Sequence, residues 1–273
     1  MGMFEGKKGL ILGVANDRSI AWAISQVIMA EGGICGFNHL PDKADDERQR
    51  NRRRVTNLTD QHKDSSAFVL PLDVQKDDDI ASFMAHAKKE FGQIDFLLHS
   101  IAFASLDDLK KDTIATSREG FKLAMEISAY SLLAVVNAAK DIFSADSSVL
   151  TLTYYGGERI VPGYNVMGVC KAALDACMKY AAFDLGPKGI RVNALSAGPL
   201  KTLASSAVGA KGMEHLYEAV SPMGRSVTHD EVGRIGAFLL SPMSAGITAE
   251  IVHVDAGYNA MGSPGRMLDQ LKT

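Results

Sequence analysis

Seven short apolar segments alternate with longer amphipathic segments along almost the whole chain of 273 residues. The apolar segments lie at residues 9–14, 33–40, 67–72, 95–101, 148–154, 190–197 and 250–256. They lack strict polar alternation, which is typical of parallel strands that are covered on both faces. Helical patterns lie between them at residues 18–31, 77–91, 112–143, 162–186 and 229–240. This order predicts an α/β fold, a single Rossmann-like doubly wound domain with about seven parallel strands and helices on both faces.

The composition excludes several classes of protein. The chain is 47% hydrophobic and 22% charged, and its formal net charge of −3 provides no basic field for nucleic acid. It contains no run of 18 apolar residues and does not start like a signal peptide, so we expect a cytoplasmic protein without membrane contact. Cys35, Cys170 and Cys177 show no metal-ligand spacing, which predicts reduced thiols and no metal site.

Two segments interrupt the alternation. Residues 41–64 are strongly charged and contain the arginines Arg48, Arg50, Arg52, Arg53 and Arg54. Residues 198–228 follow the sixth predicted strand and begin with small residues before becoming amphipathic. Ligands of open α/β sheets bind beyond the carboxyl ends of the strands, so residues 198–228 are a candidate substrate lid. The alternative is an ordinary surface excursion.

The end of the first predicted strand has features of a nucleotide site. Gly13 follows this strand directly, and a helix is predicted to start near Ser19. A glycine there lets backbone amides approach a pyrophosphate, and a helix N-terminus adds partial positive charge. The usual GxGxxG pattern is absent. Ser19 stands where a third glycine is expected, and we expect its hydroxyl to cap the helix and to donate to a phosphate.

The next strand ends indicate contacts for the rest of a nucleotide. An acid that binds the ribose is expected after the second strand, but Asp42 comes late for that role. The arginines that follow either meet a 2′-phosphate or form a solvated helix face. Asp73 ends the third strand and either accepts from an adenine amino group or forms a turn. Ser100 begins a small-residue end of the fourth strand, whereas His99 is expected to pack in the core.

Tyr164 and Lys171 lie seven residues apart in the predicted helix 162–186. Seven residues make almost two helical turns, so both side chains are expected on one face, about 10 Å apart along the axis. A phenol and an ammonium in this arrangement suit an acid and its electrostatic partner. Together with the nucleotide turn, the pair predicts a nicotinamide-dependent reductase.

Several blocks of the sequence resemble one known family over nearly the whole chain. They are GLILGVANDRSIAWAI, LDV, HSIAFA, MEISAYSL, residues 152–206 and VDAGYNAMG. These blocks closely resemble the bacterial enoyl-acyl-carrier-protein reductases of the short-chain dehydrogenase/reductase superfamily. Tyr154, Tyr164 and Lys171 match the two tyrosines and the lysine of that family, with its Tyr-x6-Lys spacing. Carbonyl reductases of the superfamily carry Tyr-x3-Lys instead, and Met167, four residues before Lys171, cannot donate a proton.

The resemblance implies a reaction and a role for each of these residues. A reduced nicotinamide, NADH or alternatively NADPH, gives a hydride to the β-carbon of a trans-2-enoyl thioester carried by acyl carrier protein. Tyr164 is then expected to donate a hydrogen bond to the developing enolate oxygen. Lys171 is expected to hold the nicotinamide ribose hydroxyls and to favour the ionised form of the phenol. Tyr154 is expected to line or orient the substrate pocket.

The resemblance also implies further contacts and partners. The expected cofactor contacts are Gly13, Ser19, Ile20, Asp73, Val74, Ser100, Ile101, Ala102, Lys171, Leu200 and Thr202, and the expected substrate contacts are Ala102, Phe103, Tyr154 and Tyr164. Acyl carrier protein is expected to dock on a basic patch for which Lys201, Lys211 and Arg225 are candidates. The family also implies a homotetramer.

Two other functions are compatible with the same fold. A carbonyl-reducing dehydrogenase is disfavoured by Met167. A non-catalytic nucleotide-sensing protein is disfavoured because a sensor needs neither Tyr164 nor Lys171.

Overall fold

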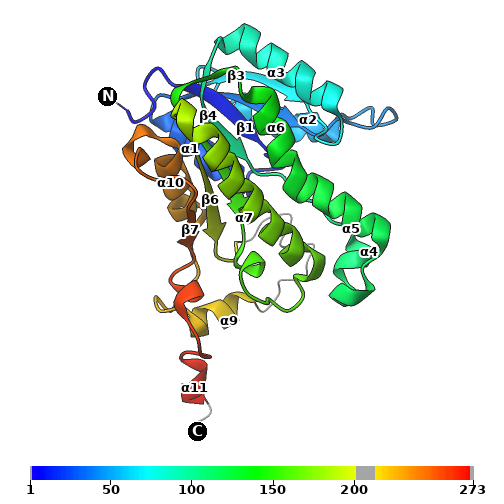
Figure 1. Ribbon diagram of the computed structural model, residues 1–273, viewed down its shortest axis with the longest axis vertical. Coiled ribbons are helices and arrows are strands. Elements are labelled where there is room, and N and C mark those ends of the chain that lie inside the picture. The colour runs from blue at the N-terminus through cyan, green and yellow to red at the C-terminus, as the bar shows by residue number, and fades with distance from the viewer. Residues whose placement is uncertain (1, 201–212, 271–273) are drawn as a thin grey trace.

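The computed structural model describes residues 2–200 and 213–270, and within them seven strands form one parallel sheet (Figure 1). The strand order is β3-β2-β1-β4-β5-β6-β7. The strands are β1 (Lys8–Leu12), β2 (Ile34–His39), β3 (Ser66–Pro71), β4 (Ile94–His99), β5 (Phe143–Thr153), β6 (Arg191–Ala197) and β7 (Ile251–Val254). The predicted α/β class and the seven parallel strands are confirmed.

Helices cover both faces of this sheet. They are α1 (Ile20–Ala30), α2 (Arg50–Thr59), α3 (Asp77–Phe91), α4 (Leu106–Leu109), α5 (Arg118–Met125), α6 (Ser131–Ala139), α7 (Asn165–Leu185), α9 (Met213–Val220), α10 (His229–Leu240) and α11 (Met267–Gln270). Leu10 and Leu12 pack into a core with α3, α6 and α7, whereas Ile11 packs into a second core with α1 and α10. Successive residues of β1 therefore serve opposite faces, which explains its continuous apolar sequence.

The strand order places a switch point beside β1. From β1 the chain builds outward through β2 to β3, then crosses to β4 and builds outward in the other direction to β7. The connections after β1 and β4 therefore leave the sheet on opposite sides. The carboxyl ends of β1 and β4 therefore mark a topological switch point, where doubly wound sheets bind ligands in a crevice.

The predicted helix 112–143 is interrupted. The structure divides it into α5, a π-helical turn (Glu126–Tyr130) and α6, and β5 already begins at Phe143. Helix α5 starts at Arg118 because the Ser117 hydroxyl caps it by accepting a hydrogen bond from the Gly120 amide at 3.0 Å. Apolar periodicity does not reveal this interruption, because α5 before it and α6 after it both bury apolar residues.

The charged segment 41–64 contains a helix that apolar periodicity did not show. The carboxylate of Asp42 accepts hydrogen bonds from the amides of Asn51 at 2.6 Å and Arg52 at 3.1 Å, in the first turn of α2. Val55 anchors the helix in the core. Asp42, which comes late for a ribose contact, thus has a structural role at the start of α2.

The helical run Arg118–Ala139 is long and apolar enough to cross a membrane by length and composition. This run is not a continuous apolar stretch, since it includes Arg118, Glu119, Lys122 and Glu126. Leu132, Val135 and Ala139 of this run are buried against the sheet. The run has the contacts of a core helix in a globular protein.

His99 packs in the core, as expected. Its Nδ1 lies 3.1 Å from the Thr151 hydroxyl, and its Nε2 lies 2.8 Å from the Ser131 hydroxyl. Burial lowers the pKa of His99 to about 3, so the ring stays neutral. The three cysteines are free thiols, and burial raises the pKa of Cys170 to about 11.

Candidate active site

Gly13 lets the ends of β1 and β4 approach closely. Its φ is +98°, and a Cβ at this position would lie 1.9 Å from the Ser100 carbonyl oxygen. The Gly13 amide donates to Oδ1 of Asn38 at 2.8 Å, which ties the turn to β2. Asn38 was not predicted from sequence, although an amide side chain within an apolar strand is a usable signal. Only glycine fits the conformation and the space at this turn.

Replacing Gly13 by alanine should lower the free energy of unfolding by about 3 kcal/mol, because both the left-handed backbone and the contact with Ser100 oppose a side chain. Urea unfolding measures the loss. Gly6→Ala is a matched control, since Gly6 has a φ of +74° and open space around it. It should lose only about 1 kcal/mol, the penalty of the backbone alone. Equal losses in the two variants would contradict the role of the contact.

Ser19 shapes the turn rather than capping helix α1. Its hydroxyl accepts hydrogen bonds from the amides of Ala15 and Asn16, both at 3.0 Å. The predicted side-chain cap is absent at this helix start, because the amides of the turn reach the hydroxyl instead. The Ser19 hydroxyl therefore accepts no hydrogen bond from the first backbone amides of α1, which begins at Ile20. These amides stay available near the carboxyl end of β1. Such a terminus suits an anion.

Asp73 forms the turn that was one of the two roles considered from sequence. Its Oδ1 accepts from the Gln75 amide at 3.1 Å, which makes a turn at the end of β3, and Lys76 lies 3.8 Å from the same carboxylate. Val74 beside it is buried. The carboxylate is still partly exposed to the crevice side of β3, so an adenine contact stays a prediction.

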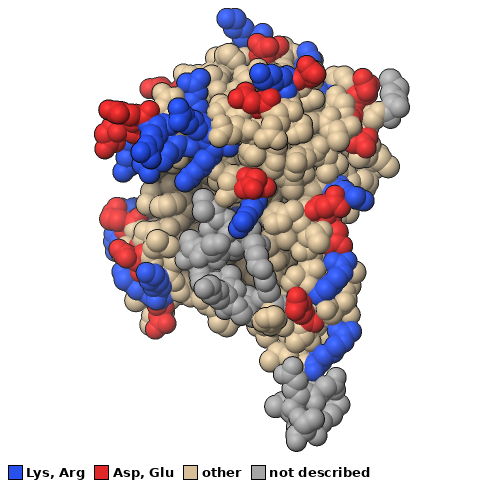
Figure 2. All heavy atoms as spheres, turned by 180° about the vertical axis from the view of Figure 1, so that it is seen from behind, with Lys and Arg blue, Asp and Glu red and all other residues tan. Residues whose placement is uncertain are grey.

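The arginines of helix α2 form an exposed group. Arg50 pairs with Asp46 at 2.9 Å, while Arg52, Arg53 and Arg54 are exposed. Figure 2 shows Lys and Arg side chains gathered at the upper left, over the part of the molecule where α2 lies. The pairing of Arg50 agrees with a solvated helix face, and a contact with a 2′-phosphate is untested.

Tyr154, Tyr164 and Lys171 meet at the carboxyl end of β5. Tyr154 follows β5 directly, and the rings of Tyr154 and Tyr164 lie 4.7 Å apart at 63°. The ammonium of Lys171, buried in α7, donates to the Leu152 carbonyl of β5 at 2.7 Å. The fold thus brings together the three residues that the sequence singled out.

Tyr164 reaches this place without being part of the helix. Helix α7 begins at Asn165, whose φ of 43° interrupts regular helical geometry. The Asn165 side chain donates to the carbonyls of Leu109 at 2.8 Å and Lys111 at 2.6 Å. The prediction that Tyr164 and Lys171 leave one helix face was therefore wrong. Packing beside Tyr154, rather than helical phase, positions the Tyr164 phenol.

Burial controls the charges of the site. It lowers the pKa of Lys171 to about 8, and Asp175 opposes this shift. Burial also raises the pKa of Tyr164 strongly, with further contributions from Tyr154, Cys170 and Asp175. The expected effect of Lys171, which was to favour the ionised phenol, is not seen, because every group that shifts the pKa of Tyr164 raises it and burial contributes most. The site holds a neutral phenol, which is a hydrogen-bond donor, beside an ammonium group.

Asp175 is a charged neighbour that the sequence analysis did not identify. It lies four residues after Lys171 on α7, it is buried, and burial raises its pKa. Residues four apart on a helix are neighbours, and the carboxylate supports the positive charge of Lys171. A carboxylate four residues after a buried lysine is a signal that could have found it.

Other predicted site residues have varied surroundings. Ser100 and Ile101 are partly buried, Ala102 is exposed, and Leu200 is buried after β6. Phe103 is half-exposed, and its backbone amide and carbonyl bind the Ser128 hydroxyl at 2.9 and 3.0 Å. Thr202, Lys201 and Lys211 lie outside the described residues.

Arg225 has a structural partner. Its guanidinium forms hydrogen bonds to Glu231 at 3.0 and 2.6 Å, and Glu231 belongs to the capping box of α10. The charge of Arg225 is thereby paired within the fold. This pairing weakens its candidacy as a docking residue for an acidic partner.

A third residue that was not predicted from sequence, Tyr217, lies on α9. The Tyr217 hydroxyl is 2.7 Å from the Tyr154 hydroxyl, although the two residues are 63 positions apart. From sequence, this segment showed only an amphipathic pattern.

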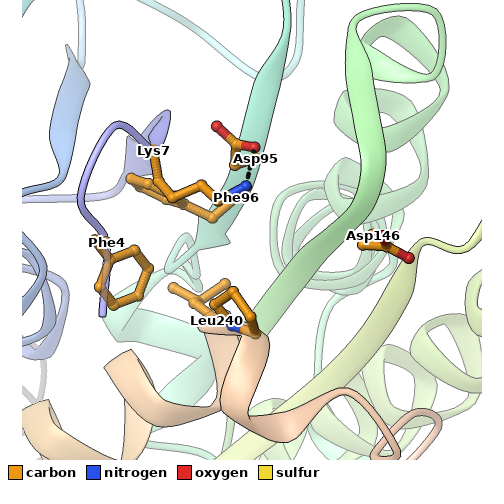
Figure 3. A pocket seen from close by; sticks show the side chains of 7 residues that line it. Phe4, Lys7, Asp95, Phe96, Asp146 and Leu240 are labelled. Carbon is orange, nitrogen blue, oxygen red and sulfur yellow. Dashed lines mark hydrogen bonds and ion pairs between the residues drawn. The ribbon is translucent and has the colours of Figure 1, made fainter. Parts of the chain in front are cut away.

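A small pocket lies at the opposite end of the sheet and is unrelated to this site (Figure 3). It is lined by residues near the amino ends of β1, β4 and β5 and by the end of α10. The ion pair of Lys7 with Asp95, at 3.0 Å, occupies its rim. Pocket and crevice are thus at opposite strand ends.

The crevice fits a nicotinamide dinucleotide. The glycine turn leaves no room for a Cβ at Gly13, the start of α1 suits a pyrophosphate, and Lys171 is a buried cation at the far side of β4. In residues 2–200 and 213–270, no group of three His, Cys, Asp or Glu side chains is arranged to hold a metal ion.

Comparisons with known proteins agree with this geometry. The family model described as enoyl-(acyl carrier protein) reductase matches residues 13–259. The enoyl-acyl-carrier-protein reductase (NADH) FabI of Nostoc sp. is 46% identical over 94% of this chain and 98% of its own length. The crystal structure of the Bacillus cereus reductase with NADP+ and indole naphthyridinone has a TM-score of 0.91 and 43% identity, covering 96% of this chain and 100% of that one. The Anaplasma phagocytophilum reductase in complex with NAD has a TM-score of 0.89 and 40% identity, covering 96% and 97%.

Proposed function

The chain belongs to the enoyl-(acyl carrier protein) reductase family, and we propose that Tyr154, Tyr164 and Lys171 form its active site. Its activity is the NAD(P)H-dependent reduction of trans-2-enoyl-acyl-carrier-protein to acyl-acyl-carrier-protein in fatty-acid elongation. The observation that carries the assignment of the site is the meeting of these three side chains at the end of β5.

Each residue has a task in the reduction. When bound, the reduced nicotinamide supplies a hydride to the β-carbon of the enoyl thioester. Negative charge then develops on the thioester oxygen, and the neutral phenol of Tyr164 donates a hydrogen bond to it. A proton from solvent or from the phenol adds to the α-carbon and completes the saturated thioester. Tyr154 orients the acyl group beside Tyr164. Lys171, anchored on the Leu152 carbonyl, offers its remaining N–H groups to the nicotinamide ribose.

The other cofactor contacts follow the strand ends. We assign the pyrophosphate to the turn after β1, the adenine to the end of β3 and the nicotinamide to the ends of β4 and β6. The residues concerned are Gly13, Ser19, Ile20, Asp73, Val74, Ser100, Ile101, Ala102, Leu200 and Thr202. Ala102 and Phe103 also border the substrate. Of these residues, Thr202 is outside the described part of the chain.

A spectrophotometric assay tests the proposal. The protein is mixed with NADH or NADPH and crotonyl-CoA, and the absorbance of the reduced cofactor is followed. A decrease with crotonyl-CoA but not with a ketoacyl thioester is the expected result. A decrease only with the ketoacyl substrate would identify a carbonyl reductase, and cofactor binding without turnover would identify a sensor.

The affinity for NADH should depend on pH through Lys171. The charged form of Lys171 is present below its pKa of about 8 and is lost as the pH rises. Since the ammonium is the form assigned to the ribose, the Kd for NADH should be constant up to about pH 7, about double by pH 8 and rise about tenfold by pH 9. Fluorescence titration measures it. Lys171→Met should bind weakly with no such step, and a step that persists in this variant would assign it to another group.

We propose that the chain assembles as a cytoplasmic homotetramer. What supports the assembly is a set of exposed large apolar side chains on α5, the following π-turn and α7: Phe121, Tyr130, Val169, Tyr180 and Phe183. Tyr180 and Phe183 are 74% and 80% exposed on the same face of α7. Such patches mark association surfaces. Phe183→Asp should convert the tetramer to smaller species in sedimentation velocity, and an unchanged sedimentation coefficient would exclude this face.

We further propose that residues 198–228 form a substrate lid on a single reductase domain. Residues 201–212 of this segment are outside the described part. Support comes from α9, which lies within the segment and contacts Tyr154 through Tyr217. Acyl carrier protein would then deliver its acyl chain beside this helix.

A further inference from the structure

Tyr217 occupies an unusual place for a tyrosine. Its side chain is 2% exposed, and its ring stacks on Tyr258 with centroids 3.8 Å apart at 15°. Its hydroxyl lies 2.7 Å from the hydroxyl of Tyr154. We propose that Tyr217 is a positioning residue, which donates a hydrogen bond to Tyr154 so that Tyr154 keeps its own proton for the acyl substrate. This inference rests on the proposed function.

The direction of the hydrogen bond follows from the surroundings of Tyr217. Among the described residues, Tyr154 is the only hydrogen-bond partner of the Tyr217 hydroxyl. If Tyr154 donated instead, the proton of the buried Tyr217 hydroxyl would have no acceptor among the described residues, whereas Tyr154 is only partly buried and can direct its proton to a substrate. With Tyr217 as donor, the proton of Tyr154 is directed elsewhere, and Tyr164 lies against the Tyr154 ring. Tyr217 thus fixes which hydroxyl presents a proton to the substrate.

The backbone around Tyr217 is fixed independently of Tyr154. Arg266 binds the end of α9 through its amide, which donates to the Ala219 carbonyl at 2.9 Å. Its guanidinium donates to the carbonyls of Ser221 at 2.8 Å and Pro222 at 3.0 Å. In Figure 1 the segment after β7 runs beside α9. The chain after β7 therefore braces α9, and the stack on Tyr258 holds the Tyr217 ring in place.

The role of the bond is electronic as well as geometric. Burial raises the pKa of Tyr154, and the hydrogen bond from Tyr217 opposes this rise. A phenol that accepts a hydrogen bond is a better donor at its own proton, because its oxygen carries developing negative charge more easily. Removing the Tyr217 hydroxyl should therefore weaken the contact of Tyr154 with the substrate and leave cofactor binding intact.

Tyr217→Phe keeps the ring and its stack while removing the donor. We expect kcat with crotonyl-CoA to fall about tenfold, with the Kd for NADH and the melting temperature nearly unchanged. Tyr258→Phe is the matched control, because in the described part of the chain no hydrogen bond involves its hydroxyl while its ring makes the same stack. Its kcat should change by less than about twofold.

A double-mutant cycle separates positioning from a structural role. If Tyr217 acts through the Tyr154 hydroxyl, Tyr217→Phe should have no effect on kcat in the Tyr154→Phe background. If the reductions in kcat caused by Tyr217→Phe and Tyr154→Phe multiply in the double variant, the inference is overturned. A Tyr217→Phe enzyme with wild-type kcat would also overturn it. A wild-type protein that does not oxidise NADH with crotonyl-CoA would overturn the proposed function as well. An active wild type with multiplying effects would overturn only the role of Tyr217.

Discussion

Replacing Tyr164 by phenylalanine should lower kcat for an enoyl thioester by about a hundredfold to a thousandfold, because one donor to the developing oxyanion is lost. The ring contact with Tyr154, at 4.7 Å, can persist in the phenylalanine variant, so the pocket keeps its shape. Affinity for NADH should be nearly unchanged, since Lys171 rather than Tyr164 is assigned to the cofactor. Initial rates with crotonyl-CoA and fluorescence titration of NADH measure the two quantities.

The adjacent residue of the same type provides the control for Tyr164→Phe. The Tyr155 hydroxyl donates to the Asn259 carbonyl at 3.3 Å, outside the group formed by Tyr154, Tyr164 and Lys171. Tyr155→Phe removes the same atom and should alter kcat by less than about threefold. Wild-type turnover in Tyr164→Phe would show that the oxyanion is stabilised by another group. Since the pKa of Tyr164 is raised, no pH step below its ordinary value should arise from this phenol.

The sheet and the central residues of the site could be predicted from the sequence because their signals are local. Runs of aliphatic residues marked all seven strands, and β1 shows why, since Leu10 and Ile11 serve opposite faces. Tyr164 and Lys171 were singled out by their spacing within one segment, and Tyr154 by the family resemblance. The helix that was expected to explain this spacing begins only after Tyr164, so the structure brings these residues together by a different geometry, and their roles stay a proposal.

The missed features depend on contacts between distant segments. Tyr217 reaches Tyr154 only because the chain after β7 braces α9, and no local pattern encodes that arrangement. Asn38 meets Gly13 across neighbouring strands. The pKa of Tyr164 depends on how completely the fold removes its phenol from water, which the nearby lysine in the sequence does not reveal. Burial and pairing are properties of the assembled molecule.

Replacing Lys171 by methionine should weaken NADH binding by about a hundredfold and also lower kcat, because charge-assisted hydrogen bonds to the ribose contribute about 1.5–3 kcal/mol each. Methionine keeps the apolar stem of a side chain that is 6% exposed, so the packing of α7 is largely preserved. The variant leaves the Leu152 carbonyl and the Asp175 carboxylate without their cation.

Lys179→Met is the matched control for Lys171→Met, since it makes the same substitution on the same helix. Lys179 is exposed and also lies near Asp175, so it tests whether any positive charge beside that carboxylate would suffice. Its NADH affinity and kcat should stay within about twofold of the wild type, because an exposed ion pair contributes little. Comparison with Tyr164→Phe completes the test. Tyr164→Phe should lower kcat alone, whereas Lys171→Met should lower both NADH affinity and kcat. Unchanged NADH affinity in Lys171→Met would show that Lys171 does not bind the cofactor. An equal loss of NADH affinity in Lys179→Met would show that nearby positive charge in general, and not the specific position of the Lys171 ammonium, is what binds the ribose.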